Sequence, residues 1–196
     1  MARTATIRRQ TKETEVEVTI DLDGSGTTDV STGLPFFDHM LDQLGRHGGF
    51  DLTIRAVGDL EVDGHHTIED VGIVVGETFA AALGDKAGIR RFASGLYPLD
   101  EALIEVALDL SGRAHAAIAL PFGEVLPLGD PPFNPEMAQH FLESFAANAH
   151  VTLHVTRKAG INTHHVIEAT FKGLARCLRD AIRVEGEALP STKGAL

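Results

Sequence analysis

The sequence contains one cysteine, no tryptophan and one tyrosine, and its 28 acidic residues outnumber its 17 lysines and arginines. The single Cys177 cannot form a disulfide within the chain, which favours a reducing, cytoplasmic location. The shortage of basic residues argues against nucleic-acid binding, because phosphate backbones are held mainly by clustered Lys and Arg side chains. No stretch approaches the roughly 18 consecutive apolar residues of a membrane span. No apolar segment typical of a signal peptide follows the basic N-terminus. We therefore expect a cytoplasmic protein that binds neither nucleic acid nor a membrane.

Histidine, in contrast, is abundant, and four of the ten histidines lie in two copies of one motif. The copies are His65-His66-x-x-Glu69 and His164-His165-x-x-Glu168, and each opens a segment with helical periodicity. On a helix the first His and the Glu four positions later share a face, whereas the second His projects about 100° away. One metal ion could hardly bind both histidines and the glutamate. The spacing therefore predicts two ions that each draw ligands from both copies.

The rest of the chain is typical of two copies of one α+β unit. Alternation of apolar and polar residues predicts strands at 14–22 and 50–56, and apolar stripes predict helices from Pro35 and from His65. A similar order follows, with a strand at 106–110, a helix around His140, a strand at 151–155 and a helix from His164. The segment 7–9 is matched with 89–91, and 18–22 with 106–110. We predict a duplicated chain with half-domains 1–88 and 89–196, related by a pseudo-twofold axis.

Each half supplies a lone histidine on its first helix and one His-His-x-x-Glu motif on its second. If the site follows the repeat, one ion takes His65, Glu69, His140 and His165, and the other takes His39, His66, His164 and Glu168. Imidazole with carboxylate oxygen suits a divalent transition metal such as Mn, Fe, Co or Zn, and the absence of thiolate argues against a structural zinc site. A lone helical histidine is usually an ordinary polar residue, but the matched copies favour ligation. We expect no such role for His47, His115, His150 and His154.

Residues that bind one asymmetric substrate should differ between the halves. Lys172 aligns with Ile73, Arg113 has no basic counterpart near Ser25, and Lys193 lies beyond the last helix. Together with Arg91, these side chains are candidates for an anionic group such as a phosphate, although each could instead be a solvated surface charge. Glu13 could be a catalytic acid or base, or an exposed residue at the start of a strand.

Seven motifs in this order resemble the imidazoleglycerol-phosphate dehydratase family, and the match runs from about residue 7 to 194. The motifs are Arg9-x-Thr11-x-Glu13, Phe37-x-His39-x-x-x-Gln43, Asp63-x-His65-His66-x-x-Glu69-Asp70, Arg91-Phe92, Asp109-x-x-x-Arg113, His164-His165-x-x-Glu168-x-x-x-Lys172 and Pro190-Ser191-Thr192-Lys193-Gly194. The loop 122–133 is one that the resemblance does not place.

The resemblance implies two half-domains similar to ribosomal protein S5 domain 2. Each would be a small, mostly antiparallel sheet with two helices on one face, and the helices would pack between the sheets. It also implies an octahedral homo-oligomer whose active sites, each with two Mn²⁺ ions, form between subunits. The family converts imidazole glycerol phosphate to imidazole acetol phosphate and water in histidine biosynthesis, and the ions hold the imidazole ring as imidazolate.

Roles for individual residues also follow from the resemblance. Glu13 would be the acid/base group, ahead of Glu69 and Glu168. The residues that bind and orient the substrate would be Glu13, Gln43, Arg91, Arg113, Lys172, Ser191 and Lys193, of which the basic ones and Ser191 act chiefly through its phosphate. Two other functions compete with this one. A two-metal phosphoesterase would use metal-bound hydroxide, although such sites draw heavily on Asp. A non-catalytic metal-binding or storage protein would tolerate loss of Glu13, Arg113 or Lys172.

Overall fold

A computed structural model describes residues 3–124 and 126–194. The eight strands are β1 (Thr4–Gln10), β2 (Thr14–Asp21), β3 (Thr28–Ser31), β4 (Asp51–Gly58), β5 (Phe92–Leu99), β6 (Ala102–Asp109), β7 (His115–Ala119) and β8 (Thr152–Ala159). The four helices are α1 (Pro35–Gly48), α2 (His65–Leu83), α3 (Glu136–Asn148) and α4 (Thr163–Ala181). No helix in the described ranges is long and apolar enough to cross a membrane.

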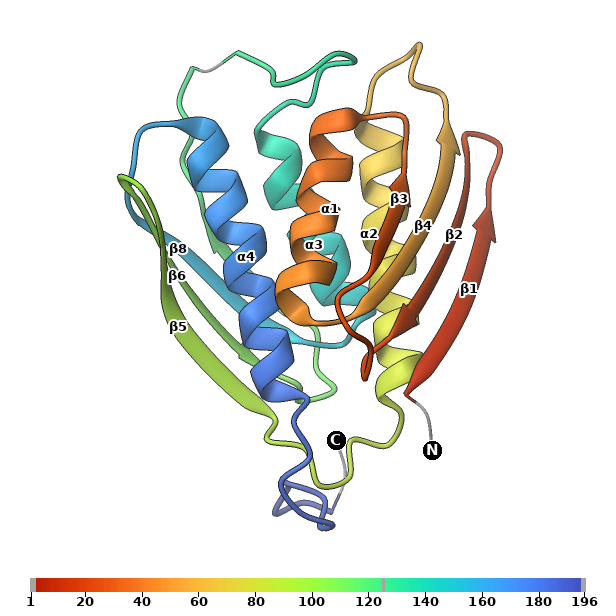
Figure 1. The fold of residues 1–196 in the computed structure, drawn as a ribbon, viewed down its shortest axis with the longest axis vertical. Helices are drawn as coiled ribbons and strands as arrows, with labels where there is room; N and C mark the ends of the chain where they lie inside the picture. The colour runs from red at the N-terminus through yellow and green to blue at the C-terminus, as the bar shows by residue number, and fades with distance from the viewer. Residues whose placement is uncertain (1–2, 125, 195–196) are drawn as a thin grey trace.

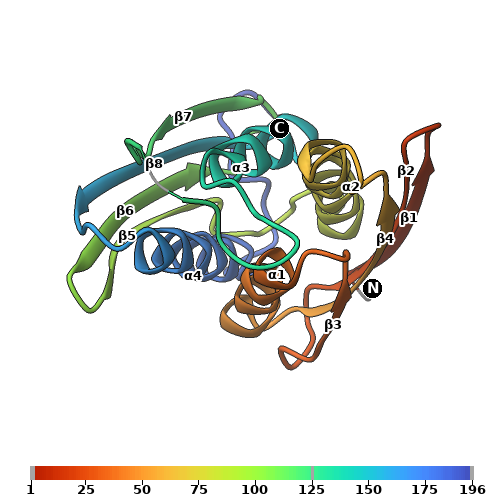
Figure 2. The same ribbon diagram turned by 90° about the horizontal axis from the view of Figure 1, so that it is seen from above.

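The strands form two sheets with the same topology, and the four helices fill the space between them (Figures 1 and 2). The strand orders are β1-β2-β4-β3 and β5-β6-β8-β7. In each sheet three strands are antiparallel, and the short third strand pairs parallel to the fourth. Each sheet turns its apolar side chains inward, as the alternation in β2 and β6 predicts. The predicted α+β fold of two half-domains is confirmed.

The helices pack mainly across the two halves, with α1 beside α4 and α2 beside α3 (Figure 2). Local signals set where these helices begin and end. Pro35 occupies the first turn of α1, and Gly49 ends it in the left-handed conformation, with φ of 71°. The side chain of Asn162 caps α4 by accepting a hydrogen bond from the backbone N–H of His165. Both His-His-x-x-Glu motifs therefore lie in the first two turns of their helices.

The repeat is clearer in the structure than in the sequence. The hairpin β1–β2 corresponds to β5–β6 at a constant offset of 88 residues, since Thr4 matches Phe92 and Thr14 matches Ala102. The match of 7–9 with 89–91 is therefore wrong, because the first triplet lies within β1 and the second precedes β5. From α1 to β4 the offset is 101, because the link between β7 and α3 is longer than its counterpart between β3 and α1. At the His-His-x-x-Glu motifs the offset is 99, because the link between β8 and α4 is shorter than the link between β4 and α2.

The described parts of that longer link, residues 120–124 and 126–135, cross the end of the helix layer that carries the starts of α1 and α4 (Figures 1 and 2). Phe133 anchors it, with its ring centroid 5.2 Å from that of Phe36 and 5.9 Å from that of Phe37. Phe36 in turn packs edge-on against His164 at 5.2 Å. Pro132 and Asn134 line a hollow next to His65. The segment that the sequence does not place thus lies next to His65 and reaches His164 through Phe36, so it is close to both His-His-x-x-Glu motifs.

Substitution Phe133→Ala is expected to lower the free energy of unfolding by about 3–5 kcal/mol, because it empties a fully buried aromatic site. Urea unfolding measures this change. Leu126→Ala, in the same link but with its residue 85% exposed, is the matched control and should change stability by less than about 0.5 kcal/mol. Equal effects of the two substitutions would show that Phe133 does not anchor the link.

Candidate metal centre and active site

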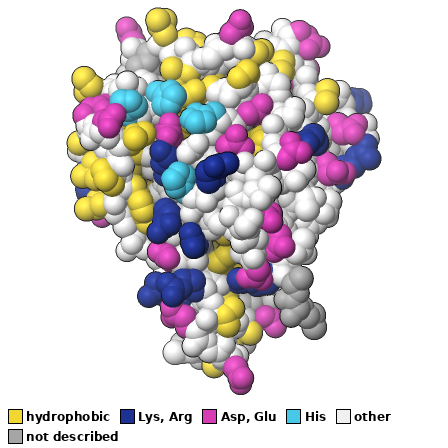
Figure 3. All heavy atoms as spheres, in the orientation of Figure 1, with side chains coloured by type: hydrophobic (Ala, Val, Ile, Leu, Met, Phe, Trp, Pro, Cys, Tyr) yellow, Lys and Arg dark blue, Asp and Glu magenta, His cyan; other side chains and the backbone are white. Residues whose placement is uncertain are grey.

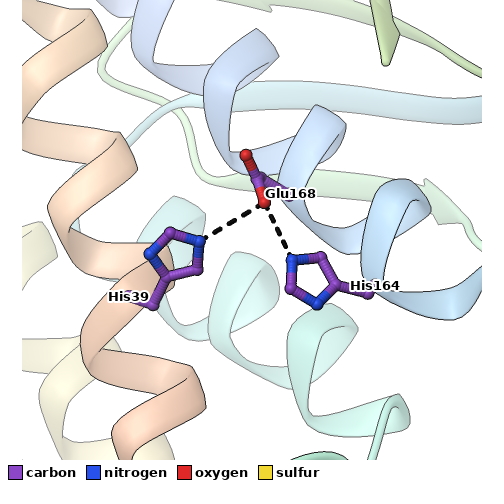
Figure 4. Close-up of side chains that lie close together, drawn as sticks. All are labelled: His39, His164 and Glu168. Atoms are coloured by element: carbon purple, nitrogen blue, oxygen red, sulfur yellow. Dashed lines mark hydrogen bonds and ion pairs between the residues drawn. The ribbon is translucent and has the colours of Figure 1, made fainter. Parts of the chain in front are cut away.

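Two clusters of metal-ligating side chains lie at the helix interfaces. The first joins His39 of α1 to His164 and Glu168 of α4 (Figure 4). One carboxylate oxygen of Glu168, Oε2, lies 2.9 Å from Nε2 of His164 and 3.4 Å from Nε2 of His39. The two imidazoles and the carboxylate therefore converge on one point between the helices, with ligand atoms within 4.8 Å of one another.

The second cluster joins His65 and Glu69 of α2 to His140 of α3, and it is the repeat counterpart of the first. The rings of His65 and His140 lie 4.6 Å apart between centroids. Nε2 of His140 is 3.6 Å from Glu69 Oε1, which is too long for a hydrogen bond. This nitrogen is buried and has no hydrogen-bond partner among the described residues. An unsatisfied buried imidazole nitrogen facing a carboxylate is a setting that suits a bound cation, and the His/His/Glu donor set suits a divalent transition metal.

Each cluster contains three of the four ligands predicted for one ion, and each takes its ligands from both halves of the chain. The fourth predicted ligand of each set, His66 or His165, lies outside the described clusters. The Nδ1 atom of His66 lies 3.0 Å from the Asp59 carboxylate, and that of His165 lies 2.8 Å from the Glu101 carboxylate. Neither histidine belongs to a described cluster. His47, His115, His150 and His154 are also absent from both clusters.

The second histidines nevertheless have the setting of metal ligands. A carboxylate on Nδ1 fixes the tautomer and ring orientation of a ligating histidine and leaves Nε2 for the ion. The Glu101 carboxylate and then other nearby acids raise the pKa of His165, and Asp59 does the same for His66. Hydrogen bonds from His165 and from the backbone N–H of Asn162 lower the pKa of Glu101 to about 2. Both histidines are therefore oriented by carboxylates.

Sequence reasoning missed Asp59 and Glu101. A signal for Glu101 was present, because at the offset of 88 residues it is the repeat counterpart of Glu13. Glu13 lies in the β1–β2 turn and faces His66, while Glu101 lies in the β5–β6 turn and faces His165. Glu13 is therefore not unique to one half. Nothing comparable marks Asp59, whose place in the loop between β4 and α2 has no acidic repeat counterpart.

The side chain of Glu13 lies near His66, the second histidine of its half, but does not form a hydrogen bond with it. Its Oε2 atom lies 3.9 Å from Nδ1 of His66, and its side chain is 57% exposed. The turn that carries it is fixed by Thr11, whose hydroxyl accepts hydrogen bonds from the backbone N–H groups of Glu13 and Thr14. The buried Asp70 of α2 accepts hydrogen bonds from Thr14 and Arg9, which ties this turn to the start of α2.

Two further predicted residues lie against the first cluster. Lys172 Nζ is 2.5 Å from Glu168 Oε1, one helical turn along α4. The Gln43 amide lies 3.4 Å from His39 Nδ1, so its described contact is with a metal-ligand candidate. Partial burial raises the pKa of Glu168, but hydrogen bonds from Lys172 and His164 outweigh this effect and lower it to about 2. The cluster therefore presents an ionised carboxylate.

The other four predicted substrate-binding residues lie at the opposite end of the helix layer from the metal clusters. They are Arg91, Arg113, Ser191 and Lys193. The backbone N–H of Arg91 donates to the carbonyl of Ala181 at the end of α4, about 20 Å along the helix from Glu168. Its guanidinium pairs with Asp109 at 2.6 and 2.9 Å and donates to the carbonyl of Pro190 at 2.7 Å. Arg113 follows β6 at the same end, and the backbone N–H of Lys193 donates to the Ser191 hydroxyl. Within one chain, the metal clusters and this basic group therefore lie apart.

Comparisons with known proteins identify the family of the chain. A sequence profile of the imidazoleglycerol-phosphate dehydratase family matches residues 32–178. A protein of that name from Granulibacter bethesdensis is 55% identical over the full length of both chains. Another, from Acidothermus cellulolyticus, is 54% identical over 99% of this chain and 93% of its own.

Solved structures extend the similarity to the fold. The imidazoleglycerol-phosphate dehydratase of Staphylococcus aureus superposes with a TM-score of 0.82 at 31% identity, covering 92% of this chain and 99% of its own. The enzyme from Pyrococcus furiosus, solved in complex with (S)-C348, gives a TM-score of 0.79 at 34% identity and covers 97% of this chain and 100% of its own. The chain therefore belongs to the imidazoleglycerol-phosphate dehydratase family, the hydro-lyases of histidine biosynthesis.

Proposed function

We propose that the chain dehydrates imidazole glycerol phosphate with two Mn²⁺ ions per active site. The observation that carries this proposal is the pair of equivalent His/His/Glu clusters, one with an unsatisfied buried imidazole nitrogen. The first ion would be held by His39, His164 and Glu168, and the second by His65, Glu69 and His140. Bound to the imidazole ring of the substrate, the ions supply positive charge that favours its deprotonated form.

We further propose that the active site forms between copies of the chain in a homo-oligomer with octahedral symmetry. Two observations support this arrangement. His66 and His165, the fourth predicted ligands, lie outside the clusters of their own chain but are oriented by carboxylates. The group of Arg91, Arg113, Ser191 and Lys193 lies a helix length from the clusters. A neighbouring copy can supply both the missing ligand and the phosphate-binding side chains.

The remaining residues have separate tasks in this proposal. Glu13 moves the proton at the substrate carbon, because its carboxylate is exposed and has no hydrogen-bond partner to its oxygens among the described residues. Lys172 holds Glu168 ionised and adds positive charge for the phosphate. Arg91 is fixed by Asp109, so it braces the C-terminal segment that carries Ser191 and Lys193. We place this chemistry in the cytoplasm, where the buried free Cys177 stays reduced.

The direct test is conversion of imidazole glycerol phosphate by purified protein. Protein loaded with Mn²⁺ should form imidazole acetol phosphate, and protein treated with a chelator should not. Release of inorganic phosphate instead of the ketone would assign a phosphoesterase. Binding of Mn²⁺ without turnover would assign a metal-binding protein.

The carboxylates behind the second histidines give a separate prediction. Asp59→Asn and Glu101→Gln are each expected to weaken Mn²⁺ binding by about 10–100-fold, because an amide no longer fixes the tautomer of His66 or His165 as strongly. Titration of metal-free protein with Mn²⁺ measures the affinity. Glu105→Gln, on the outer face of β6, removes one acidic charge away from the site and is the control. Unchanged affinity in both variants would show that the two histidines do not bind the metal.

A further inference from the structure

A hollow of about 380 Å³ lies where α1 and α4 end, away from the metal clusters. Four arginines line it: Arg3 near the N-terminus, Arg46 in the last turn of α1, Arg179 in the last turn of α4, and Arg183 just beyond it. The hollow lies within the volume range of small-molecule sites. Lys and Arg side chains gather below the histidines on this face of the molecule (Figure 3).

The positive charge in the hollow is not neutralised by the protein. Arg3 pairs with Asp23 and donates to the carbonyl of Ile182, so it forms part of the wall. Arg46, Arg179 and Arg183 have no ion pair with any described residue. Most other arginines do have one, namely Arg8, Arg9, Arg55, Arg90 and Arg91. Three uncompensated arginines in one hollow are unexpected in a chain with a net charge of −11.

Helix electrostatics account for only part of this charge. The C-terminal ends of α1 and α4 each carry a partial charge of about −0.5, which favours a nearby cation. Arg179 supplies such a cation at the end of α1. Its guanidinium lies against Gly49, which caps that helix, because a Cβ built on Gly49 would be 3.7 Å from the guanidinium carbon. The two helix ends together offset about one of the three positive charges. An excess of about +2 remains, which matches a phosphate group in its dianionic form.

The basic surface also extends from the hollow toward the first metal cluster. Lys172, Arg176 and Arg179 follow one another along α4 at spacings of four and three residues, so they share one face of the helix, and Arg183 follows just beyond its end. Burial, and then the charges of Lys172 and Arg176, lower the pKa of His47 on the neighbouring α1. The row thus connects the hollow with Lys172 beside Glu168.

We propose that this hollow is a phosphate-binding site separate from the candidate active site, with Arg46, Arg179 and Arg183 as its ligands. Guanidinium groups bind phosphate oxygens through paired hydrogen bonds, and three of them suit a dianion. The ligand is a phosphate group, either that of the substrate on its way to the metal clusters or free inorganic phosphate. None of the predicted substrate-binding residues lines the hollow.

The test compares Arg46→Gln/Arg179→Gln with the wild-type protein and with Arg157→Gln. Arg157 lies on β8, far from the hollow in the fold, and has no ion pair with a described residue, so its loss is the matched charge control. Calorimetric titration of the Mn²⁺-loaded assembly with inorganic phosphate should show one fewer ion bound per chain in the double variant only. Crystals of wild-type protein soaked in tungstate should show an anomalous peak in the hollow. Arg183→Glu, which reverses one charge, should abolish that peak.

Kinetics distinguish the two sources of the phosphate. If the site collects substrate, the double variant should lose several-fold in kcat/KM, keep its kcat, and depend less on ionic strength. If the site takes free phosphate, kcat/KM without phosphate should be unchanged, and the effect of added phosphate on turnover should disappear. An equal number of phosphate ions bound in all proteins, or acidic side chains of a second copy filling the hollow, would overturn the proposal.

Discussion

Glu13→Gln is expected to reduce kcat by about 10²–10⁴-fold, the usual contribution of a positioned acid or base. The substitution keeps the size of the side chain and removes only its ability to take or give a proton. The backbone of the turn is fixed by Thr11 and by the contact of Thr14 with Asp70, so the fold should not change. Turnover at saturating Mn²⁺ measures the effect, and bound metal per chain should stay at the wild-type value.

Glu101→Gln is the matched control, because Glu101 is the repeat counterpart of Glu13. The two carboxylates differ in their contacts. Glu101 accepts hydrogen bonds from His165 at 2.8 Å and from the backbone N–H groups of Asn162 and Ile161, whereas Glu13 lies 3.9 Å from His66. Glu101 is thus committed to orienting a histidine, and Glu13 is available to the substrate. At saturating Mn²⁺ the Glu101→Gln variant should keep most of its kcat. A larger loss from Glu101→Gln than from Glu13→Gln would reverse the two assignments.

His66→Ala combined with His165→Ala is expected to abolish turnover and to break up the assembly, since each ion loses the ligand that a neighbouring copy supplies. Both side chains are partly exposed, at 35% and 29%, so each chain should keep its secondary structure. Bound Mn²⁺, size-exclusion chromatography and circular dichroism measure the three properties.

A mixing experiment separates a shared site from a site within one chain. The His66→Ala/His165→Ala variant lacks the fourth ligands, and a His140→Ala/His164→Ala variant lacks one member of each cluster. Neither variant should convert the substrate when it is assembled alone. Mixed and reassembled with Mn²⁺, they should regain part of the activity, because an intact cluster from one variant can meet intact His66 and His165 from the other. A mixture as inactive as its components would place all eight ligands within one chain.

The sequence predicts the fold well where burial determines the pattern. The strands at β2 and β4 and the starts of α1 and α2 follow from alternation, from Pro35 and from helical stripes. It predicts β1, β3, β5 and β7 poorly. These lie at the edges of the sheets, where even the inward-facing side chains are only partly buried, so the contrast between apolar and polar positions is weak. The described residues of the link between β7 and α3 are irregular, and their anchor Phe133 is recognisable only from its contacts with Phe36 and Phe37.

For the candidate site, the sequence identifies the side chains better than their partners. Three ligands of each predicted set meet in the structure because helical spacing and the repeat constrain them together. Asp59 could not be predicted, since it acts through a contact between a loop and a helix that no periodicity encodes. Glu101 could have been predicted from its offset to Glu13, but the incorrect pairing of 7–9 with 89–91 obscured the constant offset of that hairpin.

The way the helices pair across the two halves has an evolutionary consequence. His39 and His140 occupy equivalent helices, yet each completes the cluster of the opposite half. A single unduplicated half would own one lone histidine and one His-His-x-x-Glu motif, and could build neither cluster by itself. An ancestor of one half would therefore have been a symmetric dimer with two identical clusters. Duplication and fusion of its gene would keep that geometry and allow the two copies to diverge, so that Lys172 could arise opposite Ile73 without a matching change in the other half.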